Sequence, residues 1–221
     1  MRIIAGKWKG RALQTPKNNL TRPTSDRIRE ALFSALKSRI QFDEAHVLDV
    51  FAGTGALGLE ALSRGAASCY FVEKINVACA VIESNIHALN ATDKTHLLKC
   101  DAVRLGKHDK QAPFFNLVFL DPPYGKGLAE KTLQCLQEGG WLAQDALLVV
   151  EEDKRAGFIP PSGFDEIYSR AYGDTEITLL SNISLRIKLH RLFARKPSRH
   201  LRGVECFFPF HLHEPNLLCR L

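Results

Sequence analysis

The sequence has no long apolar run. None of its uninterrupted apolar stretches approaches the roughly 18 residues that a helix needs to cross a bilayer. Residues 1–13 hold only the short apolar core Ile3-Ile4, where a signal peptide has a longer hydrophobic region. We therefore expect a cytoplasmic protein that does not enter a membrane. Its 221 residues, of which 45% are hydrophobic, suffice for one globular domain with a full core, which excludes a mainly disordered chain.

Paired cysteine motifs are also missing. The six cysteines form no CxxC pair and stand mostly inside apolar runs, so we expect reduced, buried thiols and no disulfide. Four possible metal ligands near the carboxyl end, Cys206, His211, His213 and Cys219, have a spacing that matches no usual zinc pattern. We therefore expect no bound metal.

An excess of positive charge is confined to the two ends of the chain. Residues 1–30 hold eight Lys or Arg and two acids, residues 181–221 hold the same numbers, and residues 31–180 hold 14 basic and 20 acidic residues. The net charges are therefore +6, +6 and −6. This division predicts a basic amino-terminal arm (1–30), a body (31–180) and a basic carboxyl-terminal extension (181–221). Basic ends are typical of proteins that contact nucleic acid, although charge alone also fits solvated surfaces.

The body alternates short β-branched apolar runs with helical stretches. The runs at 46–51, 69–73, 96–100, 116–120 and 146–151 are nearly continuous, as strands buried on both faces of a parallel sheet require. Apolar residues recur at helical spacing over 76–90, with Asn76 and Asn90 as caps, and over 127–138. This pattern predicts a doubly wound α/β sheet whose ligands bind at the carboxyl ends of the strands.

The sheet is expected to end in antiparallel strands. The runs at 167–172 and 176–180 are separated only by Gly173-Asp174, which is a hairpin signal. Residues 183–190 alternate apolar and polar side chains, so they could form a further strand that pairs with 176–180 through a turn at Ser181-Asn182.

A glycine-rich motif follows the first predicted strand. Gly53, Gly55 and Gly58 form G-x-G-x-x-G between a strand and a helix, a motif that serves both nucleotide phosphates and S-adenosylmethionine (SAM). Glu73 lies twenty residues after Gly53, at the end of the second strand, where a carboxylate can accept hydrogen bonds from a ribose diol.

Two further acids are expected near the same crevice. Asp49 lies inside the first strand and Asp101 just past the third. SAM carries a sulfonium and an ammonium group and no phosphate, so a crevice lined by carboxylates favours SAM over a pyrophosphate.

The fourth strand ends in the tetrapeptide Asp121-Pro122-Pro123-Tyr124. Pro122 forces Asp121 into an extended conformation, so the Asp121 carboxylate and the Pro122 carbonyl can act as two neighbouring acceptors. The exocyclic amine of a nucleobase offers two N–H donors but a delocalised lone pair. Holding both hydrogens would aim that lone pair at the SAM methyl carbon, while Tyr124 stacks on the base. These residues predict methyl transfer to a base amine without a metal.

The motifs together resemble the bacterial RsmD family of small-subunit rRNA guanine-N2 methyltransferases, over about residues 2–180. The matching stretches are RIIAGKWKGRAL, RPTSDRIREALF, VLDVFAGTGALGLEALSRGA, FVEK, VFLDPPYGKGL and YGDT. The resemblance implies the class I SAM-dependent methyltransferase fold and methylation of the 2-amino group of guanine 966 of 16S rRNA, within an assembling small ribosomal subunit. It assigns base binding to residues 121–124 and SAM binding to Gly53, Gly55 and Glu73, with Asp49 and Asp101 as further members.

The amino-terminal arm fits an RNA-binding role. Its candidate phosphate contacts are Lys7, Lys9, Arg11, Arg22, Arg27 and Arg29. Trp8 could stack on RNA or pack on the body. Residues 181–221 depart from the family, and three interpretations stay open for them: an RNA-contacting extension, a mobile appendage, or a terminus with little function. We expect a monomer.

Three other functions compete with rRNA methylation. An adenine-N6 DNA methyltransferase could use the same tetrapeptide, but such an enzyme normally needs a recognition domain for which this chain has no space. A nucleic-acid-binding protein with a vestigial SAM pocket would not need Asp121 or the three glycines. A nicotinamide-dependent reductase would leave the tetrapeptide unexplained.

Overall fold

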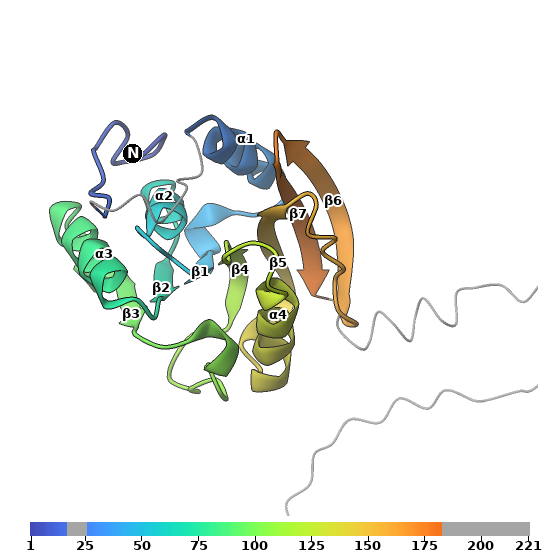
Figure 1. Cartoon of the computed structure of the whole chain (residues 1–221). Helices are drawn as coiled ribbons and strands as arrows, with labels where there is room; N and C mark the ends of the chain where they lie inside the picture. Colours follow the sequence, from blue (N-terminus) through green and yellow to red (C-terminus); the bar gives the residue numbers. More distant parts are fainter. Residues whose placement is uncertain (17–25, 183–221) are drawn as a thin grey trace, which may run out of the picture.

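The computed structural model describes residues 1–16 and 26–182, and Figure 1 shows how their elements are arranged. The predictions for Arg22, for a strand at 183–190 and for the cysteines and histidines beyond residue 205 lie outside these ranges.

The described chain forms seven strands and four helices. The strands are β1 (His46–Val50), β2 (Ser68–Val72), β3 (Thr95–Leu98), β4 (Phe115–Leu120), β5 (Leu142–Asp153), β6 (Phe164–Tyr172) and β7 (Thr175–Asn182). The helices are α1 (Asp26–Lys37), α2 (Ala56–Ser63), α3 (Asn76–Ala88) and α4 (Leu128–Gly139), with short 3-10 turns η1 (Phe42–Glu44), η2 (Thr92–Lys94) and η3 (Ala102–Arg104). None of the helices in the described ranges is long and apolar enough to cross a membrane.

All seven strands join one sheet in the order β3-β2-β1-β4-β5-β7-β6. The first five strands in this order pair in parallel, and β7 lies antiparallel between β5 and β6. This arrangement confirms the predicted doubly wound sheet with an antiparallel end. The chain moves outward from β1 to β3 and then returns to the other side of β1 as β4. Ligands of such sheets bind at this reversal, beyond the carboxyl ends of the strands.

Helices cover both faces of the sheet (Figure 1). Leu36 of α1, Leu62 of α2 and Ile82 of α3 belong to one buried cluster, and Leu133 and Leu136 of α4 belong to another. This double coverage explains the apolar runs, because four of the five residues of β1 and five of the six residues of β4 are buried.

Three local predictions were wrong. The third strand is partly exposed rather than fully buried, because β3 lies at the edge of the sheet. Asn76 does not cap α3: the capping position is Ile75, which makes no side-chain bond to the helix, whereas Asn90 does adopt the left-handed conformation (φ 49°) that ends a helix. The expected turn at Ser181-Asn182 is absent from the described chain, because both residues continue β7 and pair with β6.

The start of the chain is docked on the body. Residues 1–14 fold back on themselves through an antiparallel bridge between Arg2 and Ala12, and we call this segment the N-terminal hairpin. The fully buried Glu60 of α2 accepts hydrogen bonds from the backbone N–H groups of Ile4 (2.7 Å) and Ala5 (3.0 Å). Because Ile3 and Leu13 also belong to the core cluster beneath α1, α2 and α3, the hairpin is anchored by packing as well as by hydrogen bonds.

Gly58 allows the close contact between α2 and β2. A Cβ atom at this position would lie 2.4 Å from Cys69 Sγ and 2.6 Å from Phe71 Cε1. We expect Gly58→Ala to lower the free energy of unfolding, measured by urea denaturation, by about 1–3 kcal/mol, the usual cost of overpacking. Adding Cys69→Ala removes the nearest clashing atom and should recover part of the loss. If the single variant is as stable as the wild type, this packing argument is wrong.

Candidate active site

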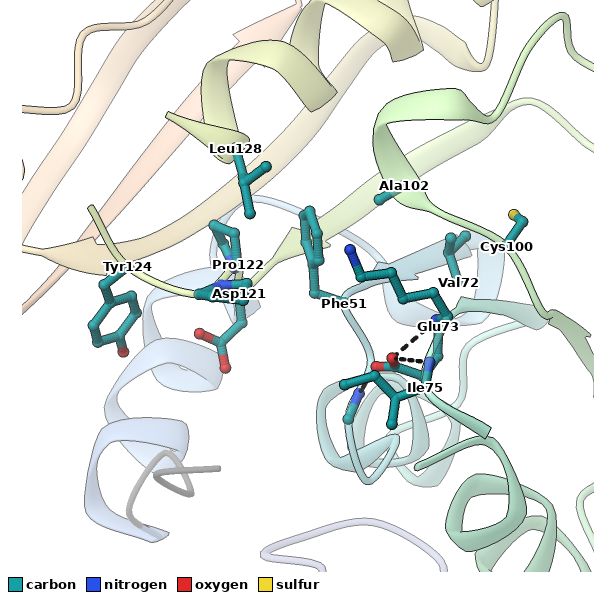
Figure 2. A pocket seen from close by; sticks show the side chains of 13 residues that line it. Phe51, Val72, Glu73, Ile75, Cys100, Ala102, Asp121, Pro122, Tyr124 and Leu128 are labelled. Carbon is teal, nitrogen blue, oxygen red and sulfur yellow. Dashed lines mark hydrogen bonds between the residues drawn. The ribbon is translucent and has the colours of Figure 1, made fainter. Parts of the chain in front are cut away.

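Three neighbouring strands place the predicted site residues at one edge of the sheet. β1 leads into the turn at residues 51–55, β2 into Glu73, and β4 into Asp121. A cavity of about 250 Å³ lies at these strand ends, and Figure 2 shows it from close by. Its lining residues are Phe51, Gly53, Val72, Glu73, Lys74, Ile75, Cys100, Ala102, Asp121, Pro122, Pro123, Tyr124 and Leu128. The glycine-rich turn, Glu73 and the proline tetrapeptide therefore share one cavity.

The backbone N–H groups of the three glycines in the motif already have partners within the protein. Gly53 N donates to Glu73 Oε2 (3.0 Å), and Gly58 N donates to Asp49 Oδ2 (2.9 Å). Gly55 N donates to the carbonyl of Ala52 (2.7 Å). A dinucleotide pyrophosphate needs such N–H groups to be free and is repelled by carboxylates. The turn therefore disfavours a nicotinamide dinucleotide and suits a ligand without phosphate.

Glu73 shapes the turn from the end of β2. Besides Gly53 N, its carboxylate accepts hydrogen bonds from the N–H groups of Lys74 (2.9 Å) and Ile75 (2.8 Å), and the residue is only 7% exposed. A carboxylate has about four lone-pair directions, so three are used in these contacts. Glu73 also lines the cavity, so a ligand hydroxyl can donate a hydrogen bond to its remaining lone pair.

The other two predicted acids are not among the side chains that line the cavity. Asp49 is buried behind the turn, where it holds Gly58 N. Asp101 pairs with Lys74 (Oδ2 to Nζ, 3.2 Å) and accepts a hydrogen bond from Val103 N (3.4 Å). In the structure, Asp49 thus acts on the cavity through the turn, and Asp101 acts through Lys74, which does line the cavity.

Asp49 has an unusual ionisation that gives a testable prediction. Burial and the nearby Glu73 raise its pKa to about 7, although the bond from Gly58 N opposes this shift. The unfolded pKa is about 3.9, so the folded chain binds more protons between about pH 4 and 7, and stability falls as pH rises through this range. The wild-type free energy of unfolding should therefore fall by about 2 kcal/mol more between pH 5 and 8 than that of Asp49→Asn, which keeps an acceptor for Gly58 N but does not titrate.

Thermal unfolding at several pH values measures this effect, and calorimetric titration with SAM provides the companion readout. Affinity for SAM should stay unchanged in Asp49→Asn, because asparagine keeps the acceptor that holds Gly58 N and the side chain does not line the cavity. A large loss of affinity with unchanged pH dependence would instead make Asp49 a ligand.

The proline tetrapeptide is held from β5. The Tyr124 hydroxyl donates a hydrogen bond to Glu151 Oε1 (2.9 Å), and Gly125 N donates to Glu152 Oε1 (2.9 Å). Both glutamates are 4% exposed. Burial and the carboxylates of Asp121 and Glu151 raise the pKa of Tyr124, so its hydroxyl stays protonated and remains a donor.

Asp121 stands among other acids. Burial, together with Glu151, Asp49 and Glu152, raises the pKa of Asp121 well above the usual carboxylate range. Such a strongly perturbed carboxyl group in a cavity is typical of a functional site, because a fold gains no stability from placing it there.

Several lining residues were not predicted from the sequence. Phe51 has a left-handed backbone (φ 59°), which is rare for a bulky side chain, and Figure 2 shows its ring between the Asp121 side and the Glu73 side of the cavity. Its position directly before the glycine-rich turn was the available signal. Ile75 lies two residues past Glu73 and lines the cavity as well. Glu151 does not line the cavity but holds the Tyr124 hydroxyl from the carboxyl end of a predicted strand, so both positions could have been inferred from the fold.

Comparison with known proteins shows the family to which the chain belongs. A family model described as "Conserved hypothetical protein 95" matches residues 1–181. "Ribosomal RNA small subunit methyltransferase D" of Escherichia coli (strain K12) is 41% identical over 157 residues, which cover 71% of this chain and 77% of that protein. The protein of the same name from Haemophilus influenzae is 35% identical over 183 residues, covering 82% and 94%. The chain belongs to the RsmD family.

The RsmD family assignment also establishes the fold class. The solved structure "Putative methyltransferase yhhF from Escherichia coli" has a TM-score of 0.72 and 34% identity, and the match covers 83% of this chain and 98% of that chain. The sheet is therefore that of a class I SAM-dependent methyltransferase. The family match ends at residue 181, one residue before the described part of the chain ends.

The predicted RNA contacts of this RsmD-family chain fall into two groups. Lys7, Lys9 and Arg11 are exposed on the N-terminal hairpin, and Arg27 is exposed on α1. Arg29 differs, because it is fully buried and donates hydrogen bonds to the carbonyl of Arg2 (2.7 Å) and to Asp26 (2.6 Å). The structure therefore gives Arg29 an internal role, joining α1 to the hairpin, and does not present it to a phosphate.

Trp8 is half-buried and packs against the core cluster, with Lys7 Nζ 4.0 Å from the centroid of its ring. Of its two predicted roles, packing on the body is the one that the structure displays.

Proposed function

We propose that this RsmD-family protein transfers a methyl group from SAM to the 2-amino group of a guanine in small-subunit rRNA, at the position equivalent to guanine 966 of 16S rRNA. The observation that carries this proposal is the shared cavity, in which the Asp121-Pro122-Pro123-Tyr124 segment faces the glycine-rich turn and Glu73. Relatives bearing the name "Ribosomal RNA small subunit methyltransferase D" support the substrate.

The cavity lining fits SAM. Glu73 offers an acceptor for ribose, and Val72, Ile75 and Ala102 offer apolar contacts for the base. Asp121 places a carboxylate where a cationic group is favoured. Because the N–H groups of the three glycines are also occupied, these acceptors and apolar contacts suit a cationic nucleoside without phosphate. When bound, SAM would supply an electrophilic methyl carbon attached to a sulfonium.

The tetrapeptide would do the chemical positioning. The Asp121 carboxylate and the Pro122 carbonyl accept the two N–H hydrogens of the guanine amine, which draws the nitrogen lone pair out of the ring and toward the methyl carbon. The nitrogen would take the methyl group that bound SAM supplies, and the sulfur would keep the electron pair of the bond that it gives up. The nitrogen then carries one proton too many, and Asp121 can accept it. The Tyr124 ring stacks on the base, in an orientation held by its bond to Glu151.

A guanine inside folded RNA must leave its stack to reach this cavity. We propose that the exposed side chains of Lys7, Lys9, Arg11 and Arg27 hold the surrounding phosphates, with rRNA in an assembling small subunit as the partner. An adenine-N6 activity on DNA remains the alternative reaction, because the same tetrapeptide can hold an adenine amine.

The test is a methylation assay with isotopically labelled SAM. Undermethylated small-subunit particles, naked rRNA and duplex DNA are each incubated with the protein, digested to nucleosides and analysed by mass spectrometry. We expect label in N2-methylguanosine at a single rRNA position. Label in N6-methyladenosine would overturn the substrate assignment, and binding of SAM without label in any substrate would favour a vestigial pocket.

A further inference from the structure

Asn85 lies at the junction of two backbone segments that are far apart in the sequence. It belongs to α3 and is 1% exposed. Its Nδ2 group donates to the carbonyl of Thr54 (3.0 Å) in the glycine-rich turn and to the carbonyl of Gln14 (3.1 Å) at the end of the N-terminal hairpin. Its Oδ1 atom accepts a hydrogen bond from Gln14 N (2.7 Å). One buried amide thus joins the hairpin to the turn.

The bond from Asn85 to the glycine-rich turn fixes the orientation of a peptide group next to the cavity. Gly53 and Gly55, on either side of Thr54, both have left-handed backbones (φ 56° and 75°). The peptide between Thr54 and Gly55 is fixed at both of its polar ends, because Asn85 holds the Thr54 carbonyl and Ala52 holds the Gly55 N–H. Without Asn85, the carbonyl would be buried without this partner, and the turn would lose one of its restraints.

The bonds from Asn85 to the hairpin also act on the backbone. Asn85 bonds both the N–H and the carbonyl of Gln14, so it fixes the backbone rather than a side chain. A second contact also joins the hairpin to the turn: the Thr54 hydroxyl lies 3.5 Å from Met1 Sδ. The hairpin that carries Lys7, Lys9 and Arg11 is therefore tied directly to the turn that forms one wall of the cavity.

We propose that Asn85 is a positioning residue of the cofactor site, which couples the N-terminal hairpin to SAM binding. Asn85 does not line the cavity and acts through the Thr54 carbonyl. Cofactor binding restrains the turn further, the turn restrains Asn85 through the Thr54 carbonyl, and Asn85 restrains the hairpin through Gln14. By thermodynamic reciprocity, RNA that engages the hairpin strengthens SAM binding. This inference rests on the proposed SAM-binding function.

Hydrogen exchange on the wild-type protein tests the coupling without any mutation. S-adenosylhomocysteine, the product form of the cofactor, is added, and amide exchange is followed by mass spectrometry. We expect slower exchange in the turn and also in the hairpin, at the bonded amides of Ile3, Leu13 and Gln14. Protection limited to the turn and cavity would overturn the coupling while leaving the cofactor assignment intact. No protection and no calorimetric binding would overturn the proposed function itself.

Kinetics then test the residue. We expect Asn85→Ala to raise the KM for SAM about tenfold, as expected when hydrogen bonds that hold a turn are lost, with a smaller change in kcat. Ligand binding should no longer protect the hairpin of this variant. Gln14→Ala is the matched control, because it leaves both backbone bonds in place and should behave as wild type. If Asn85→Ala folds poorly, Asn85→Asp keeps the acceptor for Gln14 N but cannot donate to Thr54. A fall in kcat with unchanged KM would contradict the positioning role.

Discussion

Asp121→Ala is expected to abolish nearly all methyl transfer while making the fold more stable. We expect kcat to fall by about 10³-fold, the scale seen when a preorganised group that acts on the transition state is removed. At the same time, the melting temperature should rise, because the change removes a partly buried carboxyl group that stands among Glu151, Asp49 and Glu152.

The opposite signs follow from one cause. The carboxylate of Asp121 is costly in the ground state of the free protein, since burial and three neighbouring acids disfavour its charge. In the reaction, the amine that it holds develops positive charge, so the same carboxylate is stabilised when the methyl group transfers. If Asp121 served to stabilise the fold, its removal would lower the melting temperature. A loss of kcat together with a higher melting temperature therefore identifies Asp121 as a group that acts in the reaction.

A graded series separates hydrogen bonding from charge. Asp121→Asn retains an oxygen that can accept one hydrogen of the amine but carries no charge and takes up no proton, so its kcat should fall between those of wild type and alanine. Because the pKa of Asp121 is raised, wild-type activity should decline on acidification at a pH above the usual carboxylate range. That decline should be absent from the asparagine variant.

Steady-state kinetics from pH 5 to 9 and differential scanning calorimetry provide the two measurements. The Kd for SAM, measured by calorimetry, shows whether the binding site is intact. Equal kcat values for the wild type and the alanine variant would refute the role of Asp121 in the reaction.

The sequence was a good guide wherever burial on both faces dictates composition. β1, β2 and β4 were predicted to within one or two residues, because parallel strands must be apolar along their whole length. Since the carboxyl ends of neighbouring parallel strands meet at one edge, the joint placement of Glu73 and Asp121 in one cavity also followed.

The sequence was a poor guide where a side chain's partner is set by the tertiary fold. Asp49 and Glu73 are both acids near a glycine-rich turn, yet one lies behind the turn and the other lines the cavity. Arg29 resembles any other arginine of a basic segment, but it is fully buried and donates hydrogen bonds to the Arg2 carbonyl and to Asp26. The pair of Arg29 and Asp26 lies within α1 at i,i+3 spacing, but the bond to the Arg2 carbonyl and the burial of Arg29 depend on how α1 packs on the hairpin, which composition does not record.

The basic face of the N-terminal hairpin gives the second large expected effect. We expect the triple variant with Lys7, Lys9 and Arg11 all changed to alanine to bind rRNA about 10- to 100-fold more weakly at low salt, because each lost phosphate contact also loses the release of a counterion. All three side chains are exposed. Burial and the nearby Lys94 lower the pKa of Lys7, so this face concentrates like charges, which a phosphate would relieve.

Salt dependence is the decisive readout. Loss of three phosphate contacts should reduce the slope of log K against log salt concentration by about 2 to 3. A matched control replaces Lys37, Lys107 and Lys110 with alanine, which removes the same charge from exposed positions. These three lie in segments that lead into the amino ends of β1 and β4, at the edge of the sheet opposite the cavity. The control should keep most of the wild-type affinity and slope.

If the control and the hairpin variant lose affinity equally, RNA binding depends on net charge, and the hairpin has no special part in it. If only the hairpin variant loses affinity, the effect should extend to the cofactor site. RNA binding would then no longer strengthen SAM binding in that variant, because the hairpin that Asn85 joins to the glycine-rich turn would carry no RNA. Titration of SAM in the presence and absence of rRNA measures this coupling directly.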